Sequence, residues 1–358
     1  MHTQKPSRQH RRSLLAWSRL KHHVAKHKFI SIFVAIIAIL SLWYCSDWLS
    51  FVLTLSRENY TFGASFSPKQ AEDFGLDWKA NYTALLDDLG IRHFRLMSYW
   101  NRYESQRGIY NFGDLDWQMN EAAKRGAKVS LAIGVRQPRW PECHEPSWAS
   151  KLSGNDWKNA LYGYNATVIN RYQHHPALES FQLENEAETW WFGTCGIPDI
   201  PRLSEEFDKA KQLTDKPIWM SLSDQYGLPL TPPHPDAYGY SVYTLTYNNV
   251  IPGTYFPTSP PIWYHRLRGA IITTFSGKPL FVHELQLEPW GPREIKLLSL
   301  DEQNITMSTD RIRYNIQFAR KIGFQQIDTW GSEWWYWRKV HGDDSIWQAV
   351  KSEINASR

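Results

Sequence analysis

The spacing of hydrophobic positions along the chain changes repeatedly between a strand period and a helix period. Short apolar runs predict eight strands, over residues 61–66, 92–97, 128–133, 178–185, 217–222, 238–243, 279–284 and 324–330. Segments with one apolar face predict helices over residues 78–89, 116–125, 156–172, 204–213, 263–275, 309–322 and 345–354. A helical segment is therefore expected after every strand except the fifth.

This order predicts an α/β protein with a (β/α)8 TIM barrel over residues 58–358. Parallel strands need crossover connections, and eight such strands close the sheet on itself. The alternative is an open, doubly wound sheet. No GxGxxG motif or phosphate loop follows the first strand, which disfavours that alternative.

Residues 29–55 show a different pattern, a continuous apolar run whose only charged residue is Asp47. Its length suits a membrane span, which needs about 20 apolar residues. A cleaved signal peptide is the alternative, but Trp43, Tyr44 and Trp48 stand where a cleavage site prefers small residues. We therefore expect an uncleaved transmembrane anchor.

Charge is distributed unevenly around this run. Residues 1–28 hold eight Lys and Arg and no acidic residue, so the formal net charge of +4 leaves −4 for the rest of the chain. Because Lys and Arg mark the cytoplasmic side, residues 1–28 are expected to be a cytoplasmic tail, with the barrel outside the cytoplasm. The mildly acidic barrel argues against a nucleic-acid partner.

Two cysteines, Cys143 and Cys195, lie in the predicted loops after the third and fourth strands. These loops are neighbours in a barrel, and a disulfide can persist outside the cytoplasm, so a bridge between them is plausible. Two free thiols are the alternative. No CxxC or Cys/His spacing supports a metal site, and neither a metal nor a cofactor is expected.

Two strands end on a glutamate. Glu186 follows the fourth strand and Glu284 ends the seventh, and the carboxyl ends of barrel strands are where catalytic residues lie. Strand alternation would place Gln182, Glu184 and Glu186 on one face, with Glu186 outermost. Two such carboxyl groups suit glycoside cleavage, in which one protonates the leaving oxygen and the other attacks the sugar. A solvated loop acid is the simpler explanation of Glu186.

Three segments together resemble clan A glycoside hydrolases, which are retaining enzymes built on a (β/α)8 barrel. The first is Asn185-Glu186, the second is Glu284, and the third runs from Phe94-Arg-Leu-Met-Ser-Tyr-Trp100 to Pro138-Arg-Trp140. The resemblance covers about residues 58 to 350. The loop after the third strand lacks the His that some of these families carry there, so the particular family is not fixed.

The resemblance implies roles for these residues. Glu186 would be the acid/base and Glu284 the nucleophile. The residues placed at the substrate site are Arg95, Trp100, Trp140, Asn185, Tyr243, His283 and Trp330. Asn185 would bond the sugar 2-hydroxyl, Tyr243 would touch the nucleophile, and Arg95 would keep Glu284 ionised. Arg95 could instead form an ordinary ion pair, and Trp330 could simply pack in the core.

Tryptophan is unusually frequent, with 19 residues. Those that follow predicted strands are Trp140, Trp190, Trp191, Trp290, Trp330, Trp334, Trp335 and Trp337. Sugars stack their C–H faces on aromatic rings, so some of these residues could line subsites for an oligo- or polysaccharide, while others pack helices onto the barrel.

The sequence therefore predicts a membrane-anchored retaining glycosidase acting on a cell-surface or exported polysaccharide. A transglycosylase using the same site and a non-catalytic glycan-binding barrel are the alternatives.

Overall fold

The computed structural model describes residues 8–190, 192–222 and 226–356, and divides into two units, Met1–Leu53 and Thr54–Arg358. The first unit contains one long helix, α1 (Arg8–Leu53). Its segment Ile30–Leu53 is long and apolar enough to cross a membrane, a test that a signal sequence also passes. A helix of this kind satisfies all of its backbone hydrogen bonds internally, as a membrane span requires.

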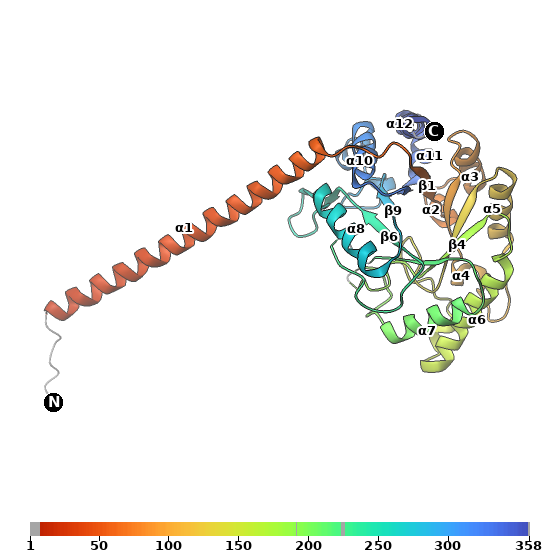
Figure 1. Cartoon of the computed structure of the whole chain (residues 1–358), viewed down its shortest axis with the longest axis horizontal. Coiled ribbons are helices and arrows are strands. Elements are labelled where there is room, and N and C mark those ends of the chain that lie inside the picture. The colour runs from red at the N-terminus through yellow and green to blue at the C-terminus, as the bar shows by residue number, and fades with distance from the viewer. Residues whose placement is uncertain (1–7, 191, 223–225, 357–358) are drawn as a thin grey trace. The chain divides into compact units, whose positions relative to one another are not determined.

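The second unit is a closed barrel of parallel strands (Figure 1). Within the described residues its eight strands are β1 (Thr61–Ser65), β2 (His93–Met97), β3 (Lys128–Ile133), β4 (Leu178–Leu183), β5 (Ile218–Ser221), β6 (Ala237–Val242), β9 (Leu280–Gln286) and β10 (Gln326–Trp330). Each pairs with its neighbours around the ring, and β1 closes the barrel against β10. The (β/α)8 prediction is confirmed.

Helices surround the strands (Figure 1). They are α2 (Pro68–Asp73), α3 (Trp78–Asp87), α4 (Trp100–Tyr103), α5 (Gly113–Lys124), α6 (Gly154–Tyr172), α7 (Ile200–Lys211), α8 (Ile262–Ser276), α9 (Leu300–Thr306), α10 (Thr309–Ile322), α11 (Ser332–Val340) and α12 (Ser345–Ala356). Short 3-10 helices span Ala149–Lys151 and Ile295–Leu297. No helix lies between β5 and β6 among the residues described there, as the sequence predicts.

Local sequence explains where several helices begin and end. The carboxylate of Asp77 accepts hydrogen bonds from the backbone of Lys79 and Ala80 and so caps α3. Helix α10 starts after the cap Ser308 and ends at Gly323, whose φ of 96° lies in the left-handed region. The sequence did not predict the hairpin of β7 (Leu245–Tyr247) and β8 (Tyr255–Pro257) in the connection from β6 to α8.

A charged cluster lies at the amino ends of the barrel strands, with His93 and Asp328 buried and Glu179 half exposed. His93 lies 2.9 Å from Asp328 and 2.7 Å from Glu179. Gly63 makes this approach possible, because a Cβ there would stand 2.0 Å from the Asp328 carboxylate. The opposite, carboxyl end of the barrel carries the candidate site.

Candidate active site

The chain leaves strand β4 through two residues with left-handed backbone. Glu184 and Glu186 have φ values of 51° and 43°, which non-glycine residues rarely adopt. These conformations end the strand alternation at Leu183, so the predicted shared face of Gln182, Glu184 and Glu186 is wrong. The Gln182 side chain points into the barrel, where it donates to Asn185 Oδ1 at 3.1 Å.

Glu184 instead points to the helix layer. Its carboxylate accepts from the backbone N–H of Arg136 at 2.5 Å and pairs with Arg202 of α7 at 3.0 Å. Both partners lie outside the strand ring, so Glu184 fixes the loops after β3 and β4 rather than lying beneath the substrate. Backbone strain at a strand end is typical of functional sites, where the surrounding structure holds it.

Glu284, on β9, lies in an ion pair at the mouth of the barrel. Arg95 Nη2 donates to its Oε1 at 2.6 Å, and the Tyr243 hydroxyl donates to its Oε2 at 2.7 Å. Burial by itself would raise the pKa of Glu284, but the charge of Arg95, supported by these hydrogen bonds, lowers the pKa below its ordinary value. Glu284 is therefore held as an anion.

Glu186 is held in the opposite protonation state. Burial raises the pKa of Glu186 well above its ordinary value, and the negative charge of Glu284 raises it further. Its Oε1 accepts from Ser241 at 2.7 Å, and its backbone N–H donates to Ser221 at 2.6 Å. The pocket therefore contains one protonated and one ionised carboxyl group, the division that general-acid and nucleophilic chemistry require.

His283 and Arg95 lie beneath these two carboxyl groups. Ser241 bonds both Glu186 and His283 Nε2, the latter at 3.0 Å, and His283 Nδ1 lies 2.8 Å from Arg95. Burial lowers the pKa of His283 to about 3, so the ring is neutral. Both residues are fully buried, and they link Glu284 to Ser241 and, through it, to Glu186.

Asn185 lies between Glu142 and Arg95, although strand alternation would place it on the face opposite Glu186. Its Nδ2 donates to Glu142 at 3.1 Å, and its Oδ1 lies 3.5 Å from Arg95 Nη1. Glu142 was not predicted from the sequence. The signal available was its place beside Cys143, because a bridge from Cys143 to the loop after the fourth strand brings Glu142 to Asn185.

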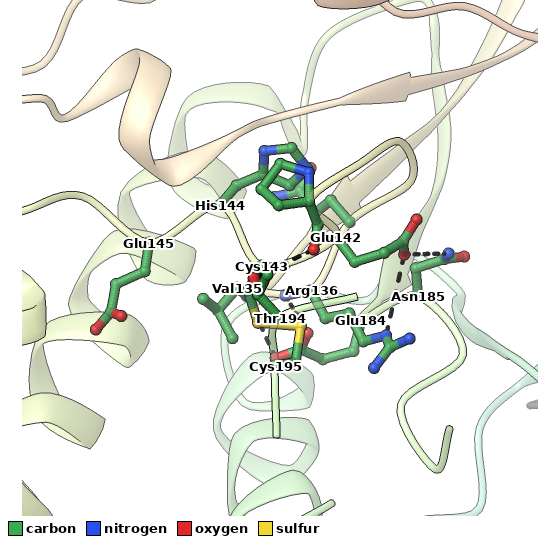
Figure 2. Close-up of a disulfide and its surroundings, with 12 residues drawn as sticks. Val135, Arg136, Glu142, Cys143, His144, Glu145, Glu184, Asn185, Thr194 and Cys195 are labelled. Carbon is green, nitrogen blue, oxygen red and sulfur yellow. Dashed lines mark hydrogen bonds and ion pairs between the residues drawn. A yellow bond between two sulfur atoms is a disulfide. The ribbon is translucent and has the colours of Figure 1, made fainter. Parts of the chain in front are cut away.

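The predicted disulfide is present. Cys143 and Cys195 are bonded, with their Cα atoms 5.2 Å apart (Figure 2). Figure 2 shows the Glu142 side chain reaching from beside this bridge toward Asn185, with Arg136 and Glu184 close by. The bridge joins the loops after β3 and β4 next to the residues that carry the candidate chemistry.

A second buried charge cluster lies beside Trp330. Arg139 pairs with Glu288 at 2.6 Å and with Glu333 at 2.7 Å, and its guanidinium lies 3.8 Å from the centre of the Trp330 ring. Trp330 packs with Met97 and Tyr99 and is 7% exposed. Only this small exposed part of the Trp330 ring is available to a sugar.

The aromatic residues predicted at the site divide into two groups. Trp100 is fully buried, stacks on Tyr164 and donates to Glu104 at 2.7 Å, so it packs in the core and its assignment to substrate binding is wrong. Trp334 and Trp335 are also buried. Trp140, Trp190 and Trp290 are 67%, 67% and 45% exposed, whereas Trp191 lies outside the described residues.

In the part of the chain that the structure describes, no group of three or more His, Cys, Asp or Glu side chains is arranged to hold a metal ion.

Comparisons with known proteins place the fold. No family model matches the chain, and no curated protein matches it either. Among solved structures, the chain is similar to a GH5_18 protein from Bifidobacterium longum subsp. longum in complex with Manβ1-4GlcNAc. The TM-score is 0.57 and the identity 14%, over 83% of this chain and 78% of that one.

A β-galactosidase from Rahnella sp. R3 gives a TM-score of 0.55 at 15% identity, over 85% of this chain and 56% of that one. A GH5_18 protein from Streptomyces cattleya in complex with GlcNAc gives a TM-score of 0.52 at 14% identity, over 77% of this chain and 71% of that one. At these identities the likeness shows the fold, so the expected resemblance to clan A glycoside hydrolases is confirmed for the architecture of the barrel.

Proposed function

We propose that this chain is a retaining glycoside hydrolase. The observation that carries the proposal is a buried chain of contacts, Glu186–Ser241–His283–Arg95–Glu284, that joins two strand-end carboxyl groups. Burial raises the pKa of Glu186, and Arg95 lowers the pKa of Glu284. When the surroundings push the pKa values of two carboxyl groups apart in this way, the group with the raised pKa can act as the acid and the ionised group as the nucleophile. The solved neighbours, which are glycoside hydrolases by name, support the same chemistry.

In the proposed mechanism, Glu284 attacks the anomeric carbon while Glu186 gives its proton to the departing glycosidic oxygen. The glycosidic bond breaks and a covalent bond to Glu284 forms. Glu186, now ionised, then takes a proton from water, which attacks the anomeric carbon and releases Glu284. Arg95 and Tyr243 hold the carboxylate in place through both steps, and Asn185 would bond the sugar 2-hydroxyl.

We further propose that residues 29–55 anchor the protein in a membrane, that residues 1–28 are a cytoplasmic tail, and that residues 58–358 act outside the cytoplasm on an oligo- or polysaccharide. The basic residues before the apolar run support the orientation. The exposed rings of Trp140, Trp190 and Trp290 support an extended saccharide, because each offers a stacking surface.

The test is release of new reducing ends from a panel of polysaccharides by the full-length chain in detergent. We expect release by the wild-type protein, no release by Glu284→Gln, and a first product with the anomeric configuration of the substrate. Exposed Glu188 is the matched control, because Glu188→Gln removes one acid close to the site and should leave release intact.

Two results would contradict the proposal. An inverted first product would exclude the retaining mechanism. Equal saccharide binding by wild-type and Glu284→Gln proteins, with no release by either, would favour the glycan-binding alternative. Transfer of the sugar to another saccharide in place of water would show a transglycosylase using the same covalent intermediate.

A further inference from the structure

Glu142 is a buried carboxyl group that the proposed mechanism does not use. It lies in the loop after β3, with its side chain 10% exposed, and it accepts a hydrogen bond from Asn185 Nδ2 at 3.1 Å. The nearest cationic atom is Arg136 Nε at 4.0 Å (Figure 2). Asn185 joins Glu142 to the pocket in which Glu186 and Glu284 lie.

Four other buried carboxylates around the mouth of the barrel have close cationic partners, whereas Glu186, like Glu142, has none in the described part of the chain. The pairs are Glu284 with Arg95 at 2.6 Å, Glu288 with Arg139 at 2.6 Å, Glu333 with Arg139 at 2.7 Å and Glu184 with Arg202 at 3.0 Å. Arg136 does not serve Glu142 in the same way. Its Nη1 and Nη2 donate to the backbone carbonyls of Thr189 and Phe192, at 2.7 and 3.2 Å. The only cation paired with Glu142 among the described residues is therefore Arg136, whose Nε lies at 4.0 Å, farther than in the four pairs above, and this counter-charge is weak for a buried carboxylate.

The fold holds this carboxyl group in place at a conformational cost. Glu142 has a φ of 71°, in the left-handed region. In the loop after β4, a Cβ at Gly193 would stand 2.8 Å from the Glu142 Cβ, so only glycine fits at position 193. The Glu142 N–H donates to the Arg139 carbonyl at 2.8 Å, and the next residue is bonded into the disulfide. Such strain persists only where the surrounding structure enforces it.

We propose that Glu142, positioned by Asn185, binds a free amino group on the sugar that occupies the catalytic pocket. The substrate class is then a glycoside of a 2-amino-2-deoxy sugar with an unsubstituted amine. The inference rests on the proposed function, in which Asn185 lies at the C2 substituent. An ammonium group there would supply a close counter-charge, whereas Arg136 offers one only at 4.0 Å.

The electrostatics of the pocket agree with this assignment. Burial raises the pKa of Glu142 to about 8, and the negative charge of Glu284 contributes. The empty pocket therefore holds Glu142 protonated near neutral pH. When an ammonium group binds, the Glu142 proton leaves to solvent and an ion pair remains, whereas a neutral amine takes that proton directly.

The test compares three β-1,4-linked gluco-configured tetrasaccharides that differ only at C2. They are cellotetraose, fully deacetylated chitotetraose and fully N-acetylated chitotetraose. Calorimetry is done with the full-length Glu186→Gln protein, which retains Glu142 and Glu284 but does not turn over. At pH 8, where releasing the Glu142 proton costs little, we expect the deacetylated tetramer to bind at least about tenfold tighter than cellotetraose, since a charge-assisted contact is worth about 1.5 kcal/mol or more.

Two further measurements assign the preference to Glu142. Introducing Glu142→Gln into the Glu186→Gln protein should abolish the preference for the deacetylated tetramer. Introducing Glu188→Gln, which replaces an exposed acid two residues beyond Glu186, should leave the preference in place. Titration in buffers of different ionisation enthalpy, near pH 6.5, should show release of about one proton per deacetylated tetramer bound when Glu142 is present. This readout does not depend on the stability of the double variant.

The inference is overturned if cellotetraose binds as tightly as the deacetylated tetramer, if none of the three binds, or if the preference survives Glu142→Gln. The inference is also overturned if the protein prefers cellotetraose and Glu142→Gln abolishes that preference, because Glu142 would then bind a sugar hydroxyl group and not an amino group. Each of these results leaves the proposed glycosidase standing as long as wild-type protein releases reducing ends from another polysaccharide.

Discussion

Glu184 and Glu186 are two residues apart, yet their carboxyl groups lie on opposite sides of the barrel wall. Glu184 pairs with Arg202 in the helix layer, whereas Glu186 bonds Ser241 in the pocket. The left-handed backbone at both residues produces this separation. Replacing Glu186 is therefore expected to impair turnover, whereas replacing Glu184 is expected to impair stability.

Glu284→Ala should lower turnover by at least about 10⁴-fold on every substrate, because the attacking atom is lost. Added azide should restore activity by occupying the vacated space, and the product should then have the inverted anomeric configuration. The measurement is product configuration by NMR with and without azide. Restored activity with a retained product would mean that another group is the nucleophile.

Glu186→Ala should still form the covalent intermediate from an activated aryl glycoside, whose leaving group needs no proton. The intermediate should accumulate, since no base remains to activate water, and mass spectrometry should find the sugar on Glu284. Glu184→Gln should lower thermal stability instead, with turnover per folded molecule retained. If Glu186→Ala remains fully active on an unactivated polymer, its assignment as acid/base fails.

Stability should depend on pH through Glu142. Its pKa is about 8 in the folded protein and 4.5 as the ordinary value, so between these values the folded state holds a proton that the unfolded state has lost. This contribution is fully present below the lower value and is lost as the pH rises through about 8. Glu142→Gln should therefore reduce the loss of unfolding free energy between about pH 5 and about pH 9, by roughly 1–4 kcal/mol.

Chemical denaturation of both proteins at the two pH values measures this difference. Glu188→Gln, which removes an exposed acid from the neighbouring loop, serves as the control and should behave as wild type. An unchanged pH dependence in Glu142→Gln would show that Glu142 is ionised in the folded protein throughout this range.

Replacing Cys143 and Cys195 by Ser should lower the unfolding free energy of the barrel by roughly 2–4 kcal/mol, because the bridge closes a loop across a sequence separation of 52 residues. Cys45→Ser is the matched control, since Cys45 is an exposed free cysteine on α1. Thiol labelling of unfolded, unreduced protein should modify Cys45 alone. Labelling of all three cysteines would show that the bridge does not form.

The basic residues before Phe29 predict the orientation of the anchor. Protease added outside intact cells, or outside right-side-out vesicles, should degrade the barrel and leave a tag at Met1 intact. Vesicles of the opposite orientation should give the opposite pattern. Loss of the tag with survival of the barrel in intact cells would reverse the topology.

The sequence predicts the barrel well because each strand carries its own local signal. The run over residues 128–133, for example, is apolar almost throughout and becomes β3 with the same bounds. Among the described residues between β5 and β6 there is no helix, and this too could be predicted, since a Pro-rich loop stands where a helix would otherwise lie. Boundaries differ by a few residues, mostly at helix starts.

The site was less predictable where the backbone leaves regular geometry. Alternation assigns Glu184 and Glu186 to one face, and only the left-handed φ values, which follow from tertiary contacts, separate them. Glu142 escaped notice because it lies in an irregular loop, where no period relates it to Asn185. Trp100 follows a barrel strand, but its position in the sequence does not show whether other side chains bury its ring, and in the structure they do.

Because Cys143 and Cys195 bond only under oxidising conditions, the redox state of the compartment in which the chain folds should affect the geometry of the candidate site. Under reducing conditions the loops bearing Glu142 and Glu186 would lose the covalent tie beside them, while the strands of the barrel would still pair. We therefore expect the barrel to form before its pocket is complete. A chain held in a reducing compartment should be folded but impaired in saccharide binding, and oxidation alone should restore its binding.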